Sequence, residues 1–410
     1  MKSIAFLTAL LSAFSVSANA TSWMQYDQSN SPLPSNSVTA TLNDGEVTWV
    51  GTNDGLAMFD GLNWTIYKSE TSQLPDDHVY NIYKDNQENT WVSTNMGLLK
   101  ISMSGWEVVN MANSEIPTTQ IRSILSAQQN NLWIGTWGSG LLKYDGATWT
   151  VYNDQNSQLS SNGIFDVELD ETGNVWVGTY NGGVSKFDGQ NWTTYSTSNS
   201  ELPHDNVRDI TIDENGIVWF GTDDGIARKT AGNHWDVFTY LELGHSVHAV
   251  YQGIKVASGH IYFATDGGLV EFDGSTIEIF TAQNSDLPSN NLRSISEDSN
   301  QNLWLGTGNN GVAIFSEQDL LSVSNENKPD FFIPFPSPTS GSLTLDLQEN
   351  LGQEFEVLVH NSIGQMVYRT GINQYSSGNY DLDLSDLPDG ALSITIVSDR
   401  FSDTKRVLKL

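Results

Sequence analysis

Seven positions in this sequence could face a ligand, and each directly follows the threonine of a recurring Trp-x-Gly/Ser-Thr phrase or its variant. They are Asn53, Asn95, Trp137, Tyr180, Asp223, Asp266 and Gly308. The phrase is repeated with little change, whereas these residues differ from copy to copy. Such variation is typical of positions that contact a ligand and not of positions that only support a scaffold.

The residue types at these positions favour carbohydrate binding. Trp137 and Tyr180 would present aromatic faces to the C–H faces of sugar rings. Carboxylates and amides accept hydrogen bonds from hydroxyl groups, and they come from Asp223, Asp224, Asp266, Asn53 and Asn95. The alternative is that Trp137 and Tyr180 only cover the hydrophobic core or a neighbouring loop.

Catalytic chemistry has weaker support in the sequence. The chain has no cysteine, no Gly-x-Ser-x-Gly phrase, no His-Glu-x-x-His phrase and no phosphate-binding loop. The one local group of histidines is His245, His248 and His260, and residues three apart on a strand face opposite sides, which disfavours a shared metal. A turn at Asp213 lacks the spaced ligands of a calcium loop. We therefore expect no cofactor, although a metal-assisted lyase using these histidines or Asp223 and Asp266 remains an alternative.

The elements that position these residues repeat along the chain. The Trp-x-Gly/Ser-Thr phrase and its variant Tyr262–Thr265 recur at intervals of 42 or 43 residues, giving seven copies. A second phrase, Trp-x-x-Tyr/Phe, runs in phase, with weaker copies ending at Val109 and at Phe280. One repeat predicts four short strands at 164–169, 175–179, 184–187 and 192–195. Four strands in about 40–45 residues is the period of a β-propeller blade.

The sequence therefore predicts an all-β protein with a seven-bladed β-propeller over residues 21–316. Residues 21–27 have the pattern of a fourth strand before any first strand, and the last repeat ends near Phe315 without one. We expect the N-terminal strand to complete the last blade and leave no open edge. The repeated tryptophans are interpreted as packing between blades.

Both ends of the chain differ from the repeats. Residues 1–20 have a positive Lys2, a short apolar stretch and Ala18-Asn19-Ala20, which predict a signal peptide cleaved after Ala20. Residues 317–330 form a predicted linker. Residues 331–410 contain new alternating segments that predict a small immunoglobulin-like β-sandwich.

The composition and net charge of the chain restrict the classes of partner that it can bind. Without the predicted signal peptide, 17 basic and 49 acidic residues remain, a net charge of −32. Such a chain repels nucleic acid and anionic membranes, and no later segment is long and apolar enough to be a transmembrane helix. A cationic partner or calcium is compatible with the charge, but an acidic solvated surface explains it equally well.

Two resemblances follow from the motifs. Phrases such as Asn199-Ser200-Glu201-Leu202-Pro203, in phase with the Trp-x-Gly-Thr copies, resemble two-component-regulator propeller repeats, whose members often form the sensing half of a membrane-bound kinase. The resemblance fails in the sixth repeat.

The C-terminal part resembles the type IX secretion sorting domain of Bacteroidota in four segments: residues 335–341, 361–365, 384–390 and 405–410. This resemblance implies the type IX translocon as a partner, export through the periplasm, and a secreted or cell-surface location; an ordinary accessory module is the alternative.

We therefore predict a non-catalytic binding propeller that recognises an extracellular polysaccharide or partner protein. Two alternatives remain. Streptogramin lyases are also seven-bladed propellers and use a histidine with a metal, which keeps the lyase open. Related propellers also serve as accessory components of the secretion machinery.

Overall fold

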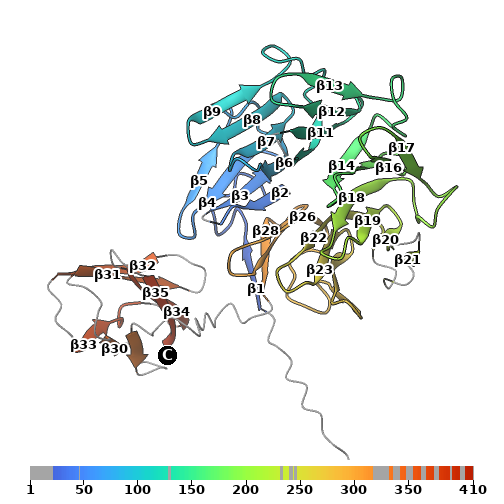
Figure 1. The fold of residues 1–410 in the computed structure, drawn as a ribbon. Coiled ribbons are helices and arrows are strands. Elements are labelled where there is room, and N and C mark those ends of the chain that lie inside the picture. The colour runs from blue at the N-terminus through green and yellow to red at the C-terminus, as the bar shows by residue number, and fades with distance from the viewer. Residues whose placement is uncertain are drawn as a thin grey trace, which may run out of the picture. The chain divides into compact units, whose positions relative to one another are not determined.

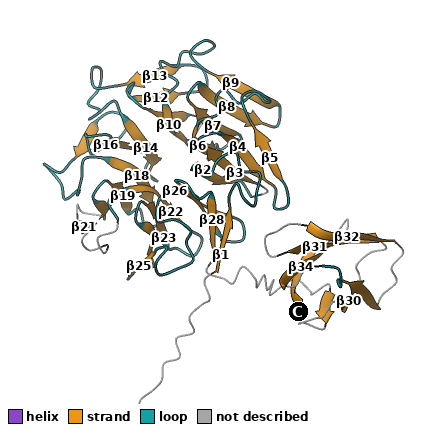
Figure 2. Cartoon of the chain, turned by 180° about the vertical axis from the view of Figure 1, so that it is seen from behind, coloured by secondary structure: helices purple, strands orange, loops and turns teal. Residues whose placement is uncertain are grey.

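The computed structural model describes residues 22–316 except 46, 128–130, 231–233, 240–242 and 244–246, together with the strands of the C-terminal part. The predicted signal peptide and linker lie outside the described residues. The chain divides into two compact units, Met1–Gln318 and Asp319–Leu410. The described residues form strands, turns and loops without a helix (Figure 2), as expected for the all-β class. Among them, no helix is present that could span a membrane.

The described part of the first unit contains seven four-stranded antiparallel sheets, which are the seven blades of the propeller (Figure 1). The predicted fold class is thus confirmed. The first strands, which adjoin one another at the centre, are β2 (Val38–Asn43), β6 (Val79–Lys84), β10 (Ile121–Ser126), β14 (Ile164–Leu169), β18 (Val207–Ile212), β22 (Val250–Lys255) and β26 (Leu292–Glu297). The second strands are β3 (Thr48–Thr52), β7 (Thr90–Thr94), β11 (Leu132–Thr136), β15 (Val175–Thr179), β19 (Val218–Thr222), β23 (Ile261–Thr265) and β27 (Leu303–Thr307).

The outer half of each blade consists of the third and fourth strands, which form a hairpin in the first six blades, whereas the N-terminal strand supplies the fourth strand of the seventh. The third strands are β4 (Gly55–Phe59), β8 (Gly97–Ser102), β12 (Leu141–Tyr144), β16 (Val184–Phe187), β20 (Gly225–Lys229), β24 (Gly268–Phe272) and β28 (Val312–Ser316). The fourth strands are β5 (Trp64–Tyr67), β9 (Gly105–Val109), β13 (Trp149–Tyr152), β17 (Trp192–Tyr195), β21 (Trp235–Phe238), β25 (Ile277–Phe280) and β1 (Ser22–Tyr26).

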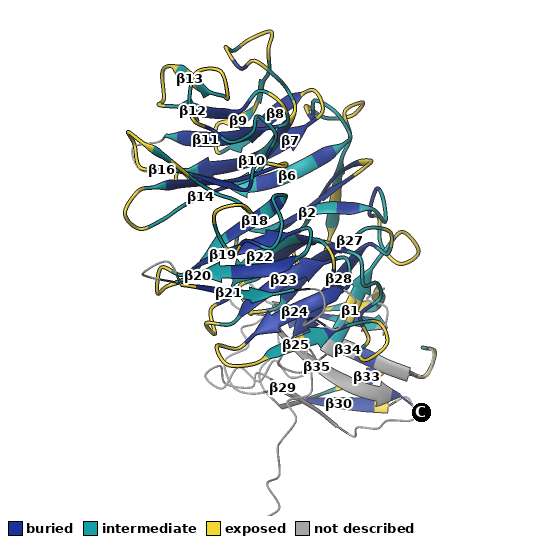
Figure 3. Cartoon of the chain, turned by 90° about the vertical axis from the view of Figure 1, so that its right-hand side faces the viewer, coloured by how far each residue is buried: buried dark blue, intermediate teal, exposed yellow. Residues whose placement is uncertain are grey.

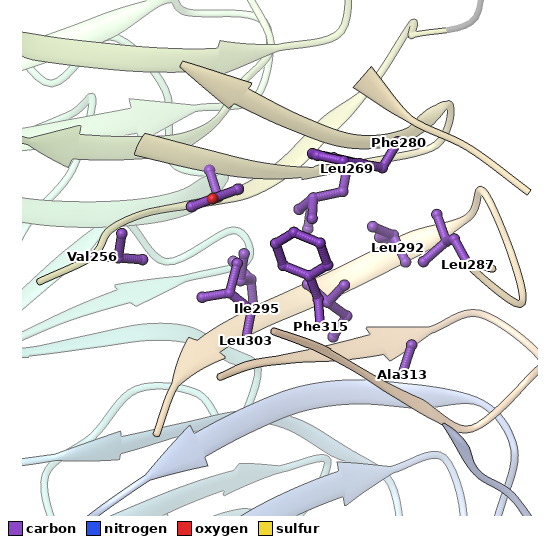
Figure 4. Close-up of a cluster of buried hydrophobic side chains, with 12 residues drawn as sticks. Val256, Leu269, Phe280, Leu287, Leu292, Ile295, Leu303, Ala313 and Phe315 are labelled. Atoms are coloured by element: carbon purple, nitrogen blue, oxygen red, sulfur yellow. The ribbon is translucent and has the colours of Figure 1, made fainter. Parts of the chain in front are cut away.

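The hydrophobic core lies between blades. Every residue of all seven second strands is buried, because each blade packs on a neighbour with both faces (Figure 3). Figure 4 shows one such core, where Leu269 and Phe280 of the sixth blade meet Ile295, Leu303 and Phe315 of the seventh. A strand buried on both faces favours apolar side chains, and the buried threonine of the phrase is satisfied by a carbonyl, as Thr52 Oγ1 donates to Gly55 O at 2.8 Å.

Aspartates hold several of the repeated tryptophans. The indole Nε1 of Trp91 donates to Asp85 Oδ2 at 2.7 Å, and that of Trp176 donates to Asp170 Oδ2 at 3.0 Å. Burial opposes ionisation of Asp85, but hydrogen bonds from Asn89 and Trp91 outweigh it and lower the pKa of the carboxyl. Asp213 plays the same part for Trp219, so its carboxylate serves the turn and not a calcium loop.

The N-terminal strand β1 closes the ring. It pairs with β28, with Trp23 opposite Phe315 and Tyr26 opposite Val312. The Trp23 ring lies 4.7 Å from that of Phe315 and 6.3 Å from that of Phe280 in the sixth blade. The Tyr26 ring lies 5.4 Å from Trp64 in the first blade. One strand therefore joins three blades.

One seam between blades lacks the aromatic ring that the fourth strand supplies in other blades. In most blades the fourth strand ends in a tyrosine or phenylalanine beside the tryptophan of the second strand, as with Trp176 and Tyr195, whose ring centroids are 5.8 Å apart. Val109 occupies this position in the second blade. A groove of about 620 Å³ is found there, lined by Trp91, Val109, Tyr144 and Trp149 among others.

The second unit contains two sheets around one core. The sheets have the strand orders β29-β30-β33 and β32-β31-β34-β35. Their strands are β29 (Phe332–Phe335), β30 (Ser342–Leu347), β31 (Glu354–Asn361), β32 (Met366–Asn373), β33 (Gly378–Asp383), β34 (Gly390–Val397) and β35 (Ser402–Lys409). Buried side chains of both sheets, including Leu345, Val357 and Ile394, form a single cluster. The unit is therefore a small β-sandwich.

Replacing Trp23 by alanine should destabilise the propeller, because it removes the ring that links the N-terminal strand to two blades. We expect the free energy of unfolding to fall by about 3 kcal/mol. The matched control is Met24→Ala, since the neighbouring Met24 is 37% exposed and should change it by less than about 1 kcal/mol. Urea denaturation followed by tryptophan fluorescence measures both, and equal losses would contradict the closing role of Trp23.

Filling the groove at Val109 should stabilise the fold. Val109→Tyr restores the ring that other blades carry and should raise the free energy of unfolding by about 1 kcal/mol. Val108 points to the opposite side and packs against the core between the first two blades, so Val108→Tyr should destabilise by overpacking. Thermal melts of the two variants are expected to shift in opposite directions.

Candidate functional site

A β-bulge recurs at the same place in every blade. Each first strand loses register with its second strand between its first and third residues. A bulge bends the strand and re-aims the extra side chain. The seven bulge residues are Thr39, Tyr80, Arg122, Phe165, Arg208, Tyr251 and Arg293.

The bulge residues line one cavity. All seven border a space of about 440 Å³, which we call the mouth, and Asn53, His78 and Gly308 also line it. Seven first strands surround the centre of the propeller, so bulges at equal heights bring side chains from every blade to one place. The repeat thereby converts a strand irregularity into a ring of side chains.

The candidate residues after each phrase lie next to this ring. The backbone N–H of Trp137 donates to Gln120 O at 2.8 Å, that of Tyr180 to Gly163 O at 2.8 Å, and that of Asp266 to Ala249 O at 3.0 Å. Each of these carbonyls belongs to the residue two positions before a bulge. Asn53, Asp223 and Gly308 make the same type of bond. Of the predicted set, Asn53 and Gly308 line the mouth itself, and these backbone bonds place Trp137, Tyr180, Asp223 and Asp266 next to its bulges.

Trp137 and Tyr180 come together with a third ring that sequence reasoning did not include. The Trp137 and Tyr180 ring centroids are 5.2 Å apart, and Phe165 lies 5.3 Å from Trp137 and 6.1 Å from Tyr180. Tyr180 is 44% exposed, and Trp137 is partly buried. The third and fourth blades thus supply an aromatic cluster at the border of the mouth.

The candidate carboxylates are largely occupied by the protein itself. Asp223 forms an ion pair with Arg208 and accepts from Asn206 Nδ2 at 2.7 Å. Burial opposes its ionisation, but these hydrogen bonds prevail and lower the pKa of Asp223. Asp266 Oδ1 accepts the backbone N–H groups of His248 and Ala249 at 2.8 and 3.0 Å. Their main contacts are therefore to the loops that shape the mouth.

The remaining predicted residues have varied partners. The backbone N–H of Asp224 donates to Thr222 Oγ1 at 3.1 Å, and Asp224 is partly buried. Asn53 Nδ2 donates to Ser37 Oγ at 2.8 Å. Asn95 Oδ1 accepts from the Tyr80 hydroxyl at 2.5 Å, and Asn95 Nδ2 donates to Asp76. These polar groups brace the loops around the mouth.

The histidines do not converge in the described part of the chain. His245 lies outside the described residues. His248 is exposed just before β22, with Nδ1 3.9 Å from Asp266 Oδ2, whereas His260 lies beyond the far end of β22 with Nδ1 2.6 Å from Glu271 Oε1. No group of three metal-ligating side chains is found among the described residues.

Arginines at the mouth are the main feature that sequence reasoning missed. Arg122 lies over the Tyr80 ring at 4.2 Å, Arg208 over Phe165 at 5.0 Å, and Arg293 over Tyr251 at 4.3 Å. In each pair the aromatic residue comes from the preceding blade. The signal was present, because aligning the repeats on their first strands puts Thr, Tyr, Arg, Phe, Arg, Tyr and Arg at one position.

Comparison with known proteins identifies both parts of the chain. The model for the two component regulator propeller matches residues 73–96, 115–138, 158–181, 201–224 and 286–309. The model for the secretion system C-terminal sorting domain matches residues 334–409. The chain carries two-component-regulator propeller repeats and a secretion sorting domain. The matched repeats do not include the first and sixth blades. No curated protein matches the sequence.

Solved structures share the fold of this propeller. One is described as the extracellular domain of a hybrid two component system of B. thetaiotaomicron, with 20% identity, a TM-score of 0.63, and 95% of this chain and 55% of that chain covered. PorZ, a surface component of the type-IX secretion system of Porphyromonas gingivalis, has 17% identity, a TM-score of 0.56 and coverages of 94% and 60%. A virginiamycin B lyase of Staphylococcus aureus has 13% identity, a TM-score of 0.59 and coverages of 72% and 99%.

The chain spans 55–60% of the length of the two-component and PorZ structures. At these identities the likeness extends to the fold.

Below the mouth, the propeller carries three carboxyl groups on adjacent first strands. Asp166 and Glu168 lie on β14 and Asp209 on β18. Asp166 Oδ2 accepts the backbone N–H of Ile210 at 2.9 Å and so joins the fourth and fifth blades. Burial raises the pKa of Asp209, and the Asp166 charge adds to this effect. Burial, again reinforced by Asp166, raises the pKa of Glu168 to about 8.

Glu168 should therefore make stability depend on pH. Its pKa is raised from an ordinary 4.5, so its stabilising effect is present in acid and is lost as the pH rises from about 4.5 to about 8. Glu168→Gln should remove this loss, so the variant gains stability over the wild type at about pH 8 and not at about pH 5. Urea midpoints at both pH values test this, with the exposed Glu171→Gln as control. An equal difference at both pH values would contradict it.

Proposed function

We propose that this chain is a secreted or surface-displayed, non-catalytic binding propeller that holds a polysaccharide at the mouth. The observation that carries the proposal is the cluster of Trp137, Phe165 and Tyr180 beside a cavity of about 440 Å³. Aromatic faces next to polar side chains suit sugar rings, which have apolar C–H faces and hydroxyl edges. Tyr180 is open enough to stack on a ligand.

The sorting domain supports the location. A secretion system C-terminal sorting domain at residues 334–409 implies interaction with that secretion system, and the structures with the same fold include extracellular domains. Passage through the periplasm requires a leader, and the predicted signal peptide cleaved after Ala20 would supply it. A propeller delivered to the cell surface meets extracellular polysaccharides.

The aromatic cluster also favours binding over the alternatives. A metal-assisted lyase needs converging ligands, and His248 and His260 lie beyond opposite ends of β22. A partner protein could use the same face, and it is the occupant to test if no glycan binds. The likeness in fold to PorZ is the ground for another alternative, an accessory role in secretion. Capture of outer-membrane components by the protein would detect that role.

Replacing Trp137 by alanine should weaken glycan binding about tenfold or more, because it removes the ring at the centre of the aromatic cluster. A glycan array followed by titration calorimetry on the full-length protein measures the change. The matched control is Tyr144→Ala, which removes an aromatic ring from the groove at Val109 instead.

The control also tests a different site. Loss of binding in Tyr144→Ala but not in Trp137→Ala would place the ligand in the groove and contradict the proposed mouth site. Absence of glycan binding by the wild-type protein would overturn the polysaccharide proposal.

A further inference from the structure

The mouth is basic although the chain is strongly acidic. The whole sequence has 49 acidic and 18 basic residues. Among the described residues, those that line the mouth include Arg122, Arg208, Arg293 and His78 and no aspartate or glutamate. Only four arginines occur in residues 21–316, and three of them are here. The fourth, Arg228, pairs with Asp236 elsewhere.

Each mouth arginine is oriented by an aromatic ring. The guanidinium groups of Arg122 and Arg293 lie over the rings of Tyr80 and Tyr251 at 4.2 and 4.3 Å. Arg122 is also 5.4 Å from the centroid of Trp137. Stacking occupies the flat face of a guanidinium and leaves the N–H groups at its edge available to hydrogen-bond an oxyanion in two places at once.

Two of the three arginines lack a carboxylate partner among the described residues. Arg208 is neutralised by Asp223. Arg122 and Arg293 form no ion pair within the described part of the chain, and the buried Nε of Arg122 has no hydrogen-bond partner there. Arg293 is exposed, whereas Arg122 is partly buried. A partly buried cation such as Arg122 without a counter-charge costs free energy, and an anionic ligand would offset that cost.

We propose that the mouth binds the anionic group of an acidic polysaccharide, a uronate carboxylate or a sulfate ester, through Arg122 and Arg293. This inference rests on the proposed function and defines its substrate class. Trp137 would stack on the sugar ring, and the neighbouring Arg122 would take the charged substituent. The same geometry discriminates against neutral glycans, which leave both arginines without a counter-charge.

Titration calorimetry of the full-length protein at about 0.15 M salt, where charges beyond about 8 Å are screened, tests the proposal. The probes are polygalacturonate, dextran sulfate and unmodified dextran. We expect at least one charged polymer to bind at least tenfold more tightly than dextran, despite the acidity of the protein. Binding of polygalacturonate alone would assign a carboxylate and binding of dextran sulfate alone a sulfate. Equal affinity for dextran would overturn the proposal.

Substitution locates the contact. Arg122→Gln and Arg293→Gln should each weaken binding of the charged polymer at least tenfold, while Arg228→Gln leaves it unchanged. Arg122→Lys keeps the charge and covers the case in which the glutamine variant fails to fold. It should retain more affinity than Arg122→Gln. Unchanged binding in folded variants of both mouth arginines would overturn the assignment.

The outcomes separate this inference from the proposed function. Binding of neutral glycans that depends on Trp137 but not on the arginines would leave the polysaccharide function intact and refute the acidic class. If no polymer binds, the proposed function fails. Free galacturonate and sulfate, followed by the fluorescence change that wild type shows and Arg122→Gln lacks, would then test the anion site alone. No response to either anion would refute it as well.

Discussion

Packing between blades is the interaction on which this structure depends. A single four-stranded blade is too small to bury both of its faces, so each second strand is buried only because neighbours cover it. Every blade therefore depends on its two neighbours for stability, and the last blade must also pack against the first. The pairing of β1 with β28 meets that condition and places Trp23 and Tyr26 at the seams of three blades. Rigid placement of the loops follows from this closure.

A closed ring also gives the site its symmetry and its departures from symmetry. Every blade repeats the bulge, so seven side chains reach one cavity from seven directions. The scaffold sets where they point, and the sequence is free to vary what they are. Aromatic residues and arginines alternate over six of the seven blades, and Thr39 occupies the remaining one. Each arginine is thus held by a ring from the preceding blade, which organises the donors before a ligand arrives.

Acidic and basic side chains lie in different parts of the propeller. Most acidic residues lie on turns, where carboxylates such as Asp170 accept backbone N–H groups and an indole N–H. Three of the four arginines in residues 21–316 line the mouth. An acidic exterior disfavours non-specific contact with polyanions, so the mouth differs in charge from the rest of the surface.

The sequence alone predicted much of the fold. The in-phase phrases determined the number of blades, the strand order and the candidate ring that includes Trp137 and Tyr180, because a repeat period of 42 or 43 residues admits few architectures. Val109 could be recognised as an exception in the same way, but not the groove that it leaves. The sorting domain was recognisable from short phrases at the right order and spacing.

Tertiary structure decided which side chains line the mouth. Strand alternation assigns a face to each residue only while the register is regular, and the bulge at Arg122, Arg208 and Arg293 breaks it. The sequence likewise did not show that Asp223 is paired with Arg208. The two residues are 15 positions apart, Arg208 on β18 and Asp223 directly after β19. Contacts of this kind depend on how strands pair in space, and so the basic character of the mouth became visible only in the folded ring.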